Sequence, residues 1–187
     1  MINRVALLDS DIQKDFCPGG ALAVPQGDEV VGPMNAINNY AQGKGWLVLA
    51  CRNWHPLNSP HFKKWPVHCV AESPGAQWHP ELKLPSSTIV VNKGADLDDD
   101  GYDAFPRIQK ILDAKGIIYL VIGGLATDYC VKTVALSAAK AGYRVILLAD
   151  ACRAINLQPN DGANALSEMK RAGVAFTTTE TLIRFGV

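Results

Sequence analysis

Three side chains whose types suit nucleophilic chemistry follow predicted strands at different points of the chain. Asp11 comes after the first apolar run, Lys93 ends the segment "TIVVNK", and Cys130 lies within "GGLATDYCVKTVA". A thiolate is a nucleophile, a carboxylate can accept a proton, and an ammonium stabilises either anion. Asp9 and Asp15 lie close to Asp11, so residue type alone leaves open which carboxylate would work.

Cys130 comes just after two glycines and the apolar run "GIIYLVI", where a helix is expected to begin near Thr127 or Asp128. Unpaired peptide N–H groups and the positive end of the helix dipole would lower the pKa of a thiol there. The same N–H groups could hold an oxyanion. A cysteine at this position can equally be ordinary buried packing, so its position leaves both interpretations open.

Histidines gather in one segment of the chain. Residues 52–87 contain all four histidines, six of the eleven prolines and three of the four tryptophans. A long irregular loop in a compact protein is usually functional. His55, His61 and His68 favour a metal site with open coordination positions, although their spacing matches no zinc finger and scattered loop histidines would look the same. His79 lies farther along and is expected to be structural.

Apolar runs recur along the chain, with helical segments between most of them. Most runs are continuous rather than alternating, as in strands buried on both faces of a parallel sheet. The expected strands are 5–8, 46–50, 88–91, 116–122, 144–149 and 174–178. Each expected helix has a glycine one or two residues beyond its end, which is the usual helix stop. These helices are 28–42, 104–114, 128–141 and 160–172.

This alternation predicts an α/β protein with a doubly wound, mostly parallel six-stranded sheet, helices on both faces and right-handed crossovers. Ligands bind beyond the carboxyl ends of the strands in such sheets. Asp11, the histidine-rich loop, Lys93 and Cys130 follow the first four strands in turn. We therefore expect them to converge on one site.

Composition narrows the class of protein. With 187 residues, 48% of them hydrophobic, the chain suits a single domain spanning residues 1–187. The 18 basic and 18 acidic residues balance, which argues against nucleic acid and against an anionic membrane surface as partners. No apolar run approaches a bilayer span, and the early charges do not fit a signal peptide. Five cysteines without a C-x-x-C pair favour a reducing, cytoplasmic setting.

Several motifs, taken in order, resemble one family over nearly the whole chain. The opening "DIQKDFCPGGALAV" is similar to D-x-Q-x-D-F-C-x-G-G-x-L-x-V, and "WPVHCV" and "SPGAQWHP" to W-P-x-H-C-V and T-P-G-A-x-F-H-P. "NKG" and "GLATDYCVKTVA" resemble a catalytic lysine segment and a nucleophile segment. The family is the nicotinamidase/pyrazinamidase branch of the isochorismatase-like cysteine hydrolases, which implies an isochorismatase-like, Rossmann-type fold.

The resemblance implies a catalytic triad of Asp11, Lys93 and Cys130, with Asp11 selected over Asp9 as the general base by the D-x-Q motif. It implies that Cys130 attacks a carboxamide, releases ammonia and leaves a thioester that water hydrolyses. It also implies a cis peptide bond before Ala126, which would aim the N–H groups of Ala126 and Cys130 at the oxyanion. The glycines at 123 and 124 would leave room for this turn.

The resemblance further implies aromatic walls around a flat substrate, formed by Phe16, Trp65 and Tyr102. It implies a divalent metal ion such as Zn, Fe or Mn. The implied ligands are Asn53, His55, His61 and His68. The family has an aspartate where this chain has Asn53, and an amide oxygen brings no charge, so weaker or altered metal binding is expected. A second departure is Asp9, an acid in an apolar strand position, which needs a partner or a raised pKa.

The expected function is hydrolysis of nicotinamide, and by implication pyrazinamide, to the carboxylate and ammonia. The expected partner is therefore a small aromatic amide, and the resemblance also allows a homo-oligomer. Asn53 favours one alternative, an isochorismatase-like hydrolase acting on a different small amide without metal. A second alternative is a non-catalytic binding protein on the same fold, which an unreactive Cys130 would favour.

Overall fold

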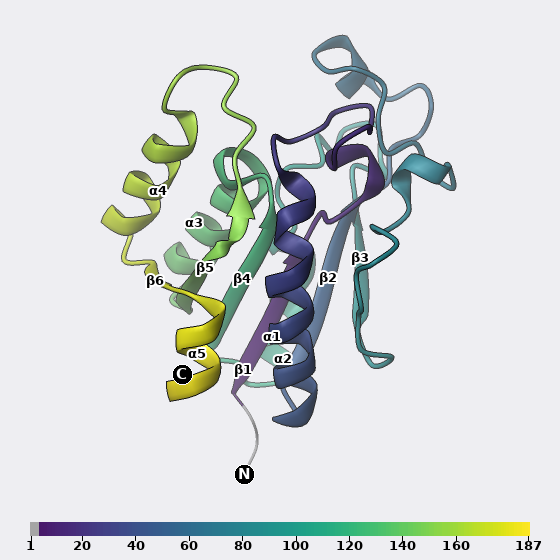
Figure 1. The fold of residues 1–187 in the computed structure, drawn as a ribbon. Coiled ribbons are helices and arrows are strands. Elements are labelled where there is room, and N and C mark those ends of the chain that lie inside the picture. The colour runs from purple at the N-terminus through teal and green to yellow at the C-terminus, as the bar shows by residue number, and fades with distance from the viewer. Residues whose placement is uncertain (1–3) are drawn as a thin grey trace.

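The computed structural model describes residues 4–187, so residues 1–3 of the expected domain lie outside the described part. Within residues 4–187, six strands form one sheet in the order β3-β2-β1-β4-β5-β6, and every neighbouring pair is parallel (Figure 1). The strands are β1 (Val5–Ser10), β2 (Leu47–Asn53), β3 (Ile89–Lys93), β4 (Tyr119–Leu125), β5 (Arg144–Arg153) and β6 (Ala175–Thr177). This confirms the expected doubly wound sheet.

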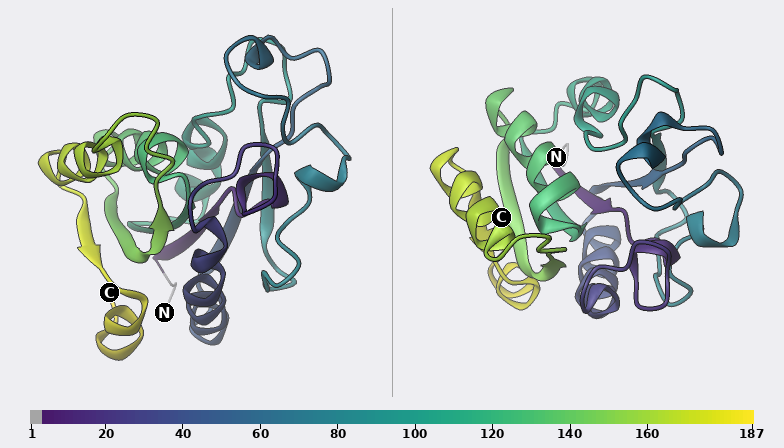
Figure 2. Two further views of the ribbon diagram at one scale, coloured as in Figure 1. Left: turned by 45° about the horizontal axis from the view of Figure 1, so that its top comes forward. Right: turned by 90° about the horizontal axis from the view of Figure 1, so that it is seen from above.

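Helices cover both faces of the sheet, as expected. α1 (Val31–Gly43) and α5 (Thr179–Phe185) pack on the face seen in Figure 1 and share one buried apolar cluster. α2 (Phe105–Ala114), α3 (Lys132–Lys140) and α4 (Asp161–Arg171) contribute to a second cluster on the opposite face. The view from above in Figure 2 shows α2 and α3 across the sheet from α1. Successive residues of a strand contribute to opposite clusters, because the pleat points neighbouring side chains to opposite faces of the sheet.

Two details of the fold differ from the sequence-based expectation. The C-terminal helix α5 was not expected, yet Thr178 caps it by accepting a hydrogen bond from the Thr181 amide. Strand β3 was expected to be buried on both faces, but Ile89 and Val90 are 37% and 44% exposed. β3 lies at the edge of the sheet, and the connection before it forms short 3-10 turns rather than a covering α-helix.

Asp9 and Asp11 do not share one face of the sheet, because β1 ends at Ser10 and Asp11 adopts a left-handed backbone with φ +53°. The Asp9 side chain faces α1, where the Asn38 amide donates to it at 2.8 Å. This hydrogen bond answers which group partners the buried acid.

The loops that follow the strands lie together at the top of Figure 1. The segment between β2 and β3 contains two 3-10 turns, Pro60–Lys63 and Pro74–Ala76, each with a serine side chain accepting at its start. The fold therefore brings the histidine-rich segment beside the carboxyl ends of the strands. Among the residues described, no helix is both long enough and apolar enough to cross a bilayer.

Candidate active site

A buried ion pair joins the ends of two strands. Lys93, the last residue of β3, donates from Nζ to Asp11 Oδ2 at 2.7 Å and to the Gly101 carbonyl at 2.7 Å. The Ser10 hydroxyl donates to the same carboxylate oxygen at 3.0 Å. Lys93 is 0% and Asp11 1% exposed. Burial alone would lower the pKa of Lys93, but the Asp11 carboxylate raises it, so the lysine is an ammonium held against a carboxylate.

The backbone around Asp11 is tightly built. Its left-handed conformation turns the chain sharply out of β1, and the Asp11 amide donates to the Cys51 carbonyl at 2.9 Å. Next to it, Gly124 has φ +122°, and a Cβ there would overlap the Ser10 backbone. Only glycine allows β4 to approach β1 this closely. The following peptide bond, Leu125–Ala126, is cis, as the family resemblance implied.

Cys130 lies in a π-helical turn, Thr127–Val131, rather than in the first turn of an α-helix. Such turns inside helices often mark functional positions. The side chain is 7% exposed, and Sγ lies 3.9 Å from the Gly101 carbonyl. The expectation of a lowered thiol pKa was wrong, because burial raises the pKa of Cys130 to about 12, and the Lys93 ammonium opposes this only in part. The resting thiol is therefore protonated.

This geometry combines a neutral thiol with a carboxyl group that can take its proton. The Lys93 ammonium lowers the pKa of the Cys130 thiol and the Asp11 carboxylate raises it, so both groups act on the thiol electrostatically. Burial raises the pKa of Asp11, and the Lys93 ammonium opposes that rise, so the carboxylate is a stronger base than an exposed aspartate. Asp11 can remove the thiol proton as the sulfur attacks and hold that proton for a later transfer.

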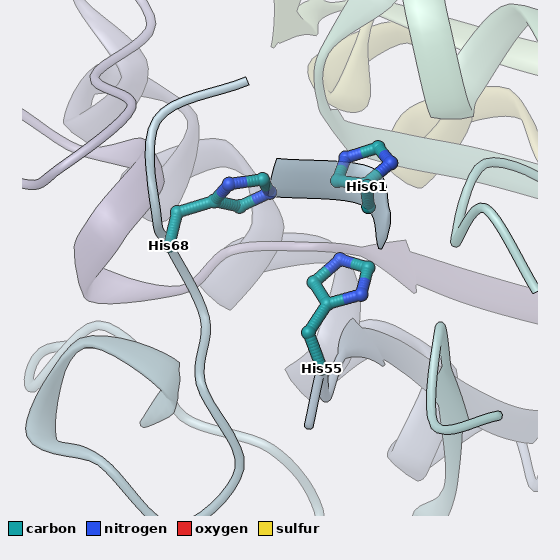
Figure 3. Close-up of side chains that lie close together, drawn as sticks. All are labelled: His55, His61 and His68. Atoms are coloured by element: carbon teal, nitrogen blue, oxygen red, sulfur yellow. The ribbon is translucent and has the colours of Figure 1, made fainter. Parts of the chain in front are cut away.

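The rings of His55, His61 and His68 turn toward one another (Figure 3), and one nitrogen of each lies within 4.8 Å of the others. The His55 and His61 rings stack at 4.7 Å with an angle of 11° between their planes. Burial, followed by the neighbouring imidazoles, lowers the pKa of His55 and of His61 to about 4. Neutral imidazoles with free lone pairs are what a transition-metal ion needs.

The tautomers of two histidines are set by backbone carbonyls. His55 Nδ1 lies 3.1 Å from the Gly94 oxygen and His68 Nδ1 lies 2.7 Å from the Pro66 oxygen. A carbonyl can only accept, so each Nδ1 carries the proton and each Nε2 keeps its lone pair. His55 Nε2 is buried and has no hydrogen-bond partner within residues 4–187.

Asn53 ends β2, next to this histidine cluster. Gln13 holds its backbone in both directions, accepting from the Asn53 amide at 2.8 Å and donating to its carbonyl at 2.8 Å. The side-chain Oδ1 of Asn53 is buried and has no hydrogen-bond partner among the described residues. A Cβ placed on Gly101 would lie 3.2 Å from His55 Nε2 and 3.5 Å from Asn53 Oδ1, so both atoms lie near this glycine. Three imidazoles and one amide oxygen fit a divalent metal ion.

A small cavity lies between the thiol and the histidine cluster. Most of the expected site residues line it, namely Phe16, Asn53, His61, Trp65, His68, Tyr102, Ala126 and Cys130. Asp11, Lys93 and His55 are buried beside these wall residues. The Trp65 indole N–H donates to the Tyr102 hydroxyl at 2.7 Å, which joins two of the expected aromatic walls. His79 is not a member of the histidine cluster.

Other wall residues were not anticipated from the sequence. They are Leu22, Val24, Leu125, Tyr129 and Ile155. The Tyr129 ring lies 5.2 Å from that of Trp65, and its place directly before Cys130 could have indicated a role. Ile155 has no comparable sequence signal. Asp128 holds it in place by accepting from the Ile155 amide at 3.0 Å and from the Asn156 amide at 2.8 Å.

A doubly wound α/β fold with a buried acid–ammonium pair beside a thiol is typical of cysteine-dependent hydrolases. Comparison with known proteins agrees with this class. Residues 5–181 match the model of the isochorismatase domain, and the chain belongs to the isochorismatase family.

Several relatives within this family are similar along most of their length. Nicotinamidase of Escherichia coli (strain K12) is 40% identical, with the match covering 92% of this chain and 94% of that protein. The crystal structure of the pyrazinamidase of Pyrococcus horikoshii in complex with zinc superposes with a TM-score of 0.89 at 38% identity, covering 94% of this chain and 99% of that one. PnC1 from L. infantum in complex with nicotinate gives 0.88 at 30% identity, covering 96% and 95%.

Proposed function

We propose that this protein is a nicotinamidase, which hydrolyses nicotinamide to nicotinate and ammonia and also accepts pyrazinamide. The observation that supports this most directly is a cavity lined by the Cys130 thiol and two imidazoles of the histidine cluster, with the Asp11–Lys93 pair buried beside its wall. The full-length similarity to proteins named nicotinamidase and pyrazinamidase supports the same substrate class.

In the proposed reaction, Asp11 accepts the Cys130 proton as Sγ attacks the carboxamide carbon. The C–S bond forms while the carbonyl π electrons move onto oxygen, and the N–H groups of Ala126 and Cys130 stabilise that oxyanion. The proton then passes from Asp11 to the amide nitrogen, so that ammonia leaves and a thioester remains. Lys93 keeps Asp11 correctly oriented and stabilises the anionic forms of the site.

The second half of the proposed reaction uses water. Asp11, again a carboxylate, takes a proton from a water molecule while the oxygen of that water attacks the thioester carbon. The C–S bond breaks, the carboxylic acid leaves and Cys130 regains its proton. A thiol with a high resting pKa suits this cycle, because the base must deliver the thiolate only during attack and must return the proton afterwards.

Phe16, Trp65 and Tyr102 are the proposed contacts for the flat face of the substrate ring, because aromatic walls favour flat heteroaromatic rings. Asn53, His55, His61 and His68 would hold a divalent ion such as Zn, Fe or Mn. When bound, such an ion would supply a Lewis-acidic anchor for a ring nitrogen. The uncharged Asn53 is expected to weaken ion binding relative to an aspartate.

The test is nicotinate formation from nicotinamide by the purified protein, before and after metal removal, with Cys130→Ala as the control. The proposal expects turnover that falls on chelation, returns with zinc and is absent from Cys130→Ala. No turnover in the zinc-restored protein, while thiol reagents still modify Cys130, would overturn the assignment of nicotinamide as substrate.

Asn53 favours one second candidate, an isochorismatase-like hydrolase that acts on another small amide and needs no metal. Full activity on such an amide after exhaustive chelation, together with none on nicotinamide, would support that candidate over the first.

A further inference from the structure

The loop that follows β3, residues 94–101, contacts both halves of the site. The Gly94 carbonyl accepts from His55 Nδ1 at 3.1 Å, and the Gly101 carbonyl accepts from Lys93 Nζ at 2.7 Å. The Gly101 carbonyl also lies 3.9 Å from Cys130 Sγ. A single loop therefore orients one imidazole of the histidine cluster and the buried ammonium.

Glycine is required at both ends of this loop. Gly94 and Gly101 have φ values of +65° and +76°, which other residues rarely adopt. A Cβ at Gly94 would overlap the His55 ring, and one at Gly101 would lie 2.8 Å from His55 Cε1. The backbone of the loop consequently lies directly against the imidazole, and small movements of the loop would be felt there.

One carboxylate holds both ends of the loop. Asp99 Oδ2 accepts from the Gly94 amide at 2.5 Å, and Asp99 Oδ1 accepts from the Gly101 amide at 2.9 Å. Arg107 in the first turn of α2 places Nη2 2.7 Å from Asp99 Oδ2. The Asp99 side chain is 14% exposed, and the neighbouring Ile108 is fully buried in the core. The carboxylate thus connects the loop to a helix fixed by core packing.

We propose that Asp99, supported by Arg107, is a positioning residue that orients His55 and Lys93 together through the two glycine carbonyls. The proposal rests on the function proposed above. Asp99 touches neither the thiol nor the cavity, so it acts on the chemistry through the loop. Asp99 binds the amides of the same two glycines whose carbonyls contact His55 and Lys93, so a shift of these glycines would disturb metal binding and proton transfer together.

The experiment compares Asp99→Asn, Arg107→Gln and Asp98→Asn, the last being an exposed acid in the same loop with the same change of charge. Zinc affinity is measured by competition with a chromophoric chelator, and nicotinamide hydrolysis is measured at saturating zinc. Asp99→Asn replaces one acceptor oxygen by an N–H donor opposite a glycine amide. We expect roughly tenfold or greater losses in both zinc affinity and kcat, with KM changed by no more than about twofold.

Arg107→Gln keeps both glycine hydrogen bonds and is expected to give smaller losses in the same two quantities. Asp98→Asn should change neither. Unchanged zinc affinity or unchanged kcat in a folded Asp99→Asn protein would overturn the proposal, because a purely structural role predicts no paired loss at equal folding, as checked by circular dichroism. If Asp99→Asn does not fold, the two readouts on Arg107→Gln decide.

Failure of the proposed function is recognised separately, by a wild-type protein that does not hydrolyse nicotinamide. In that case zinc affinity and the rate of Cys130 alkylation by iodoacetamide, located by peptide mass mapping, still test Asp99. We expect Asp99→Asn to lower zinc affinity and to speed alkylation, because the Gly101 carbonyl no longer covers the thiol. Wild-type values for either quantity would overturn the positioning role.

Discussion

Two aspartates at the end of β1 are both buried, yet they meet different partners. Asp11 contacts the Lys93 ammonium at 2.7 Å, whereas Asp9 Oδ1 accepts from the neutral Asn38 amide at 2.8 Å. Burial raises the pKa of Asp9 to about 7, and the Asn38 hydrogen bond opposes this rise only in part. Burial also raises the pKa of Asp11, but there the full charge of the Lys93 ammonium opposes the rise and forms an ion pair with the carboxylate, whereas the neutral Asn38 amide opposes the rise at Asp9 less.

The unpartnered atoms around Asp9 support this difference. Asp9 Oδ2 and Asn38 Oδ1 are both buried without a hydrogen-bond partner in the part of the chain that is described. A proton on Asp9 would give this pair of acceptors a donor. Two acids from the same short segment can therefore be a paired ion and a near-neutral acid, depending on which element each side chain faces.

The largest expected effect comes from removing the ionised acid. Asp11→Asn cannot accept the Cys130 proton, so nicotinamide turnover should fall by roughly 10²–10⁴-fold. Asp9→Asn is the matched control, since it makes the same chemical change two residues away and should retain most of the activity. Steady-state kinetics on both proteins checks this, and equal losses would contradict the assignment of Asp11 as the base.

Removing the ammonium is expected to cost stability as well as activity. Lys93→Met leaves the Asp11 carboxylate buried without its counter-ion, which should lower the free energy of unfolding by about 3–5 kcal/mol. The double variant Asp11→Asn/Lys93→Met removes both charges and should regain part of that stability while remaining inactive. Denaturant unfolding measures both, and a double variant no more stable than Lys93→Met would argue against an ionised pair.

The near-neutral acid should make stability depend on pH. The pKa of Asp9 is about 7 in the folded protein against an ordinary value of 3.8, so the folded state binds more protons between these values. Stability is therefore lost as pH rises through this window. Asp9→Asn lacks this loss, and its advantage over wild type should grow by roughly 2 kcal/mol between pH 5 and pH 8. Parallel profiles from urea unfolding would contradict the raised pKa.

A smaller effect, on zinc affinity, is expected from changes at Asn53, the amide beside the histidine cluster. Asn53→Asp adds a negative charge to an otherwise neutral set of donors, so zinc affinity should rise on the order of tenfold. Asn53→Ala removes the oxygen and should lower the affinity. Competition with a zinc chelator measures both changes, and equal affinities in the three proteins would show that Asn53 is not a ligand.

Much of the fold was predictable because continuous apolar runs and glycine stops are local features. All six strands and four of the five helices in residues 4–187 lie where the sequence indicated. Helix α5 was missed because it is short and its apolar face is completed only by packing with α1. The exposure of β3 was missed because edge position depends on strand order, which a local pattern does not contain.

The candidate site was predictable in its residue types and less so in its electrostatics. Most of the side chains named from the sequence line one cavity and the others are buried beside it, because parallel strands end at the same edge of the sheet. The pKa of Cys130 is raised rather than lowered, because the effect of burial exceeds the lowering by the Lys93 ammonium. Asp99 and Ile155 had no signal of their own, since both act through contacts with segments elsewhere in the chain.

The sequence by itself determined the succession of strands and helices and the residue types that follow each strand, because hydrophobic burial and chain reversal are written in neighbouring residues. Only the tertiary structure decided which acid is charged, which thiol is protonated and which oxygen faces the imidazoles. Asp11 and Lys93 are 82 positions apart in the chain and 2.7 Å apart in space. The charge of a buried group depends on neighbours within a few ångströms, and folding alone selects those neighbours.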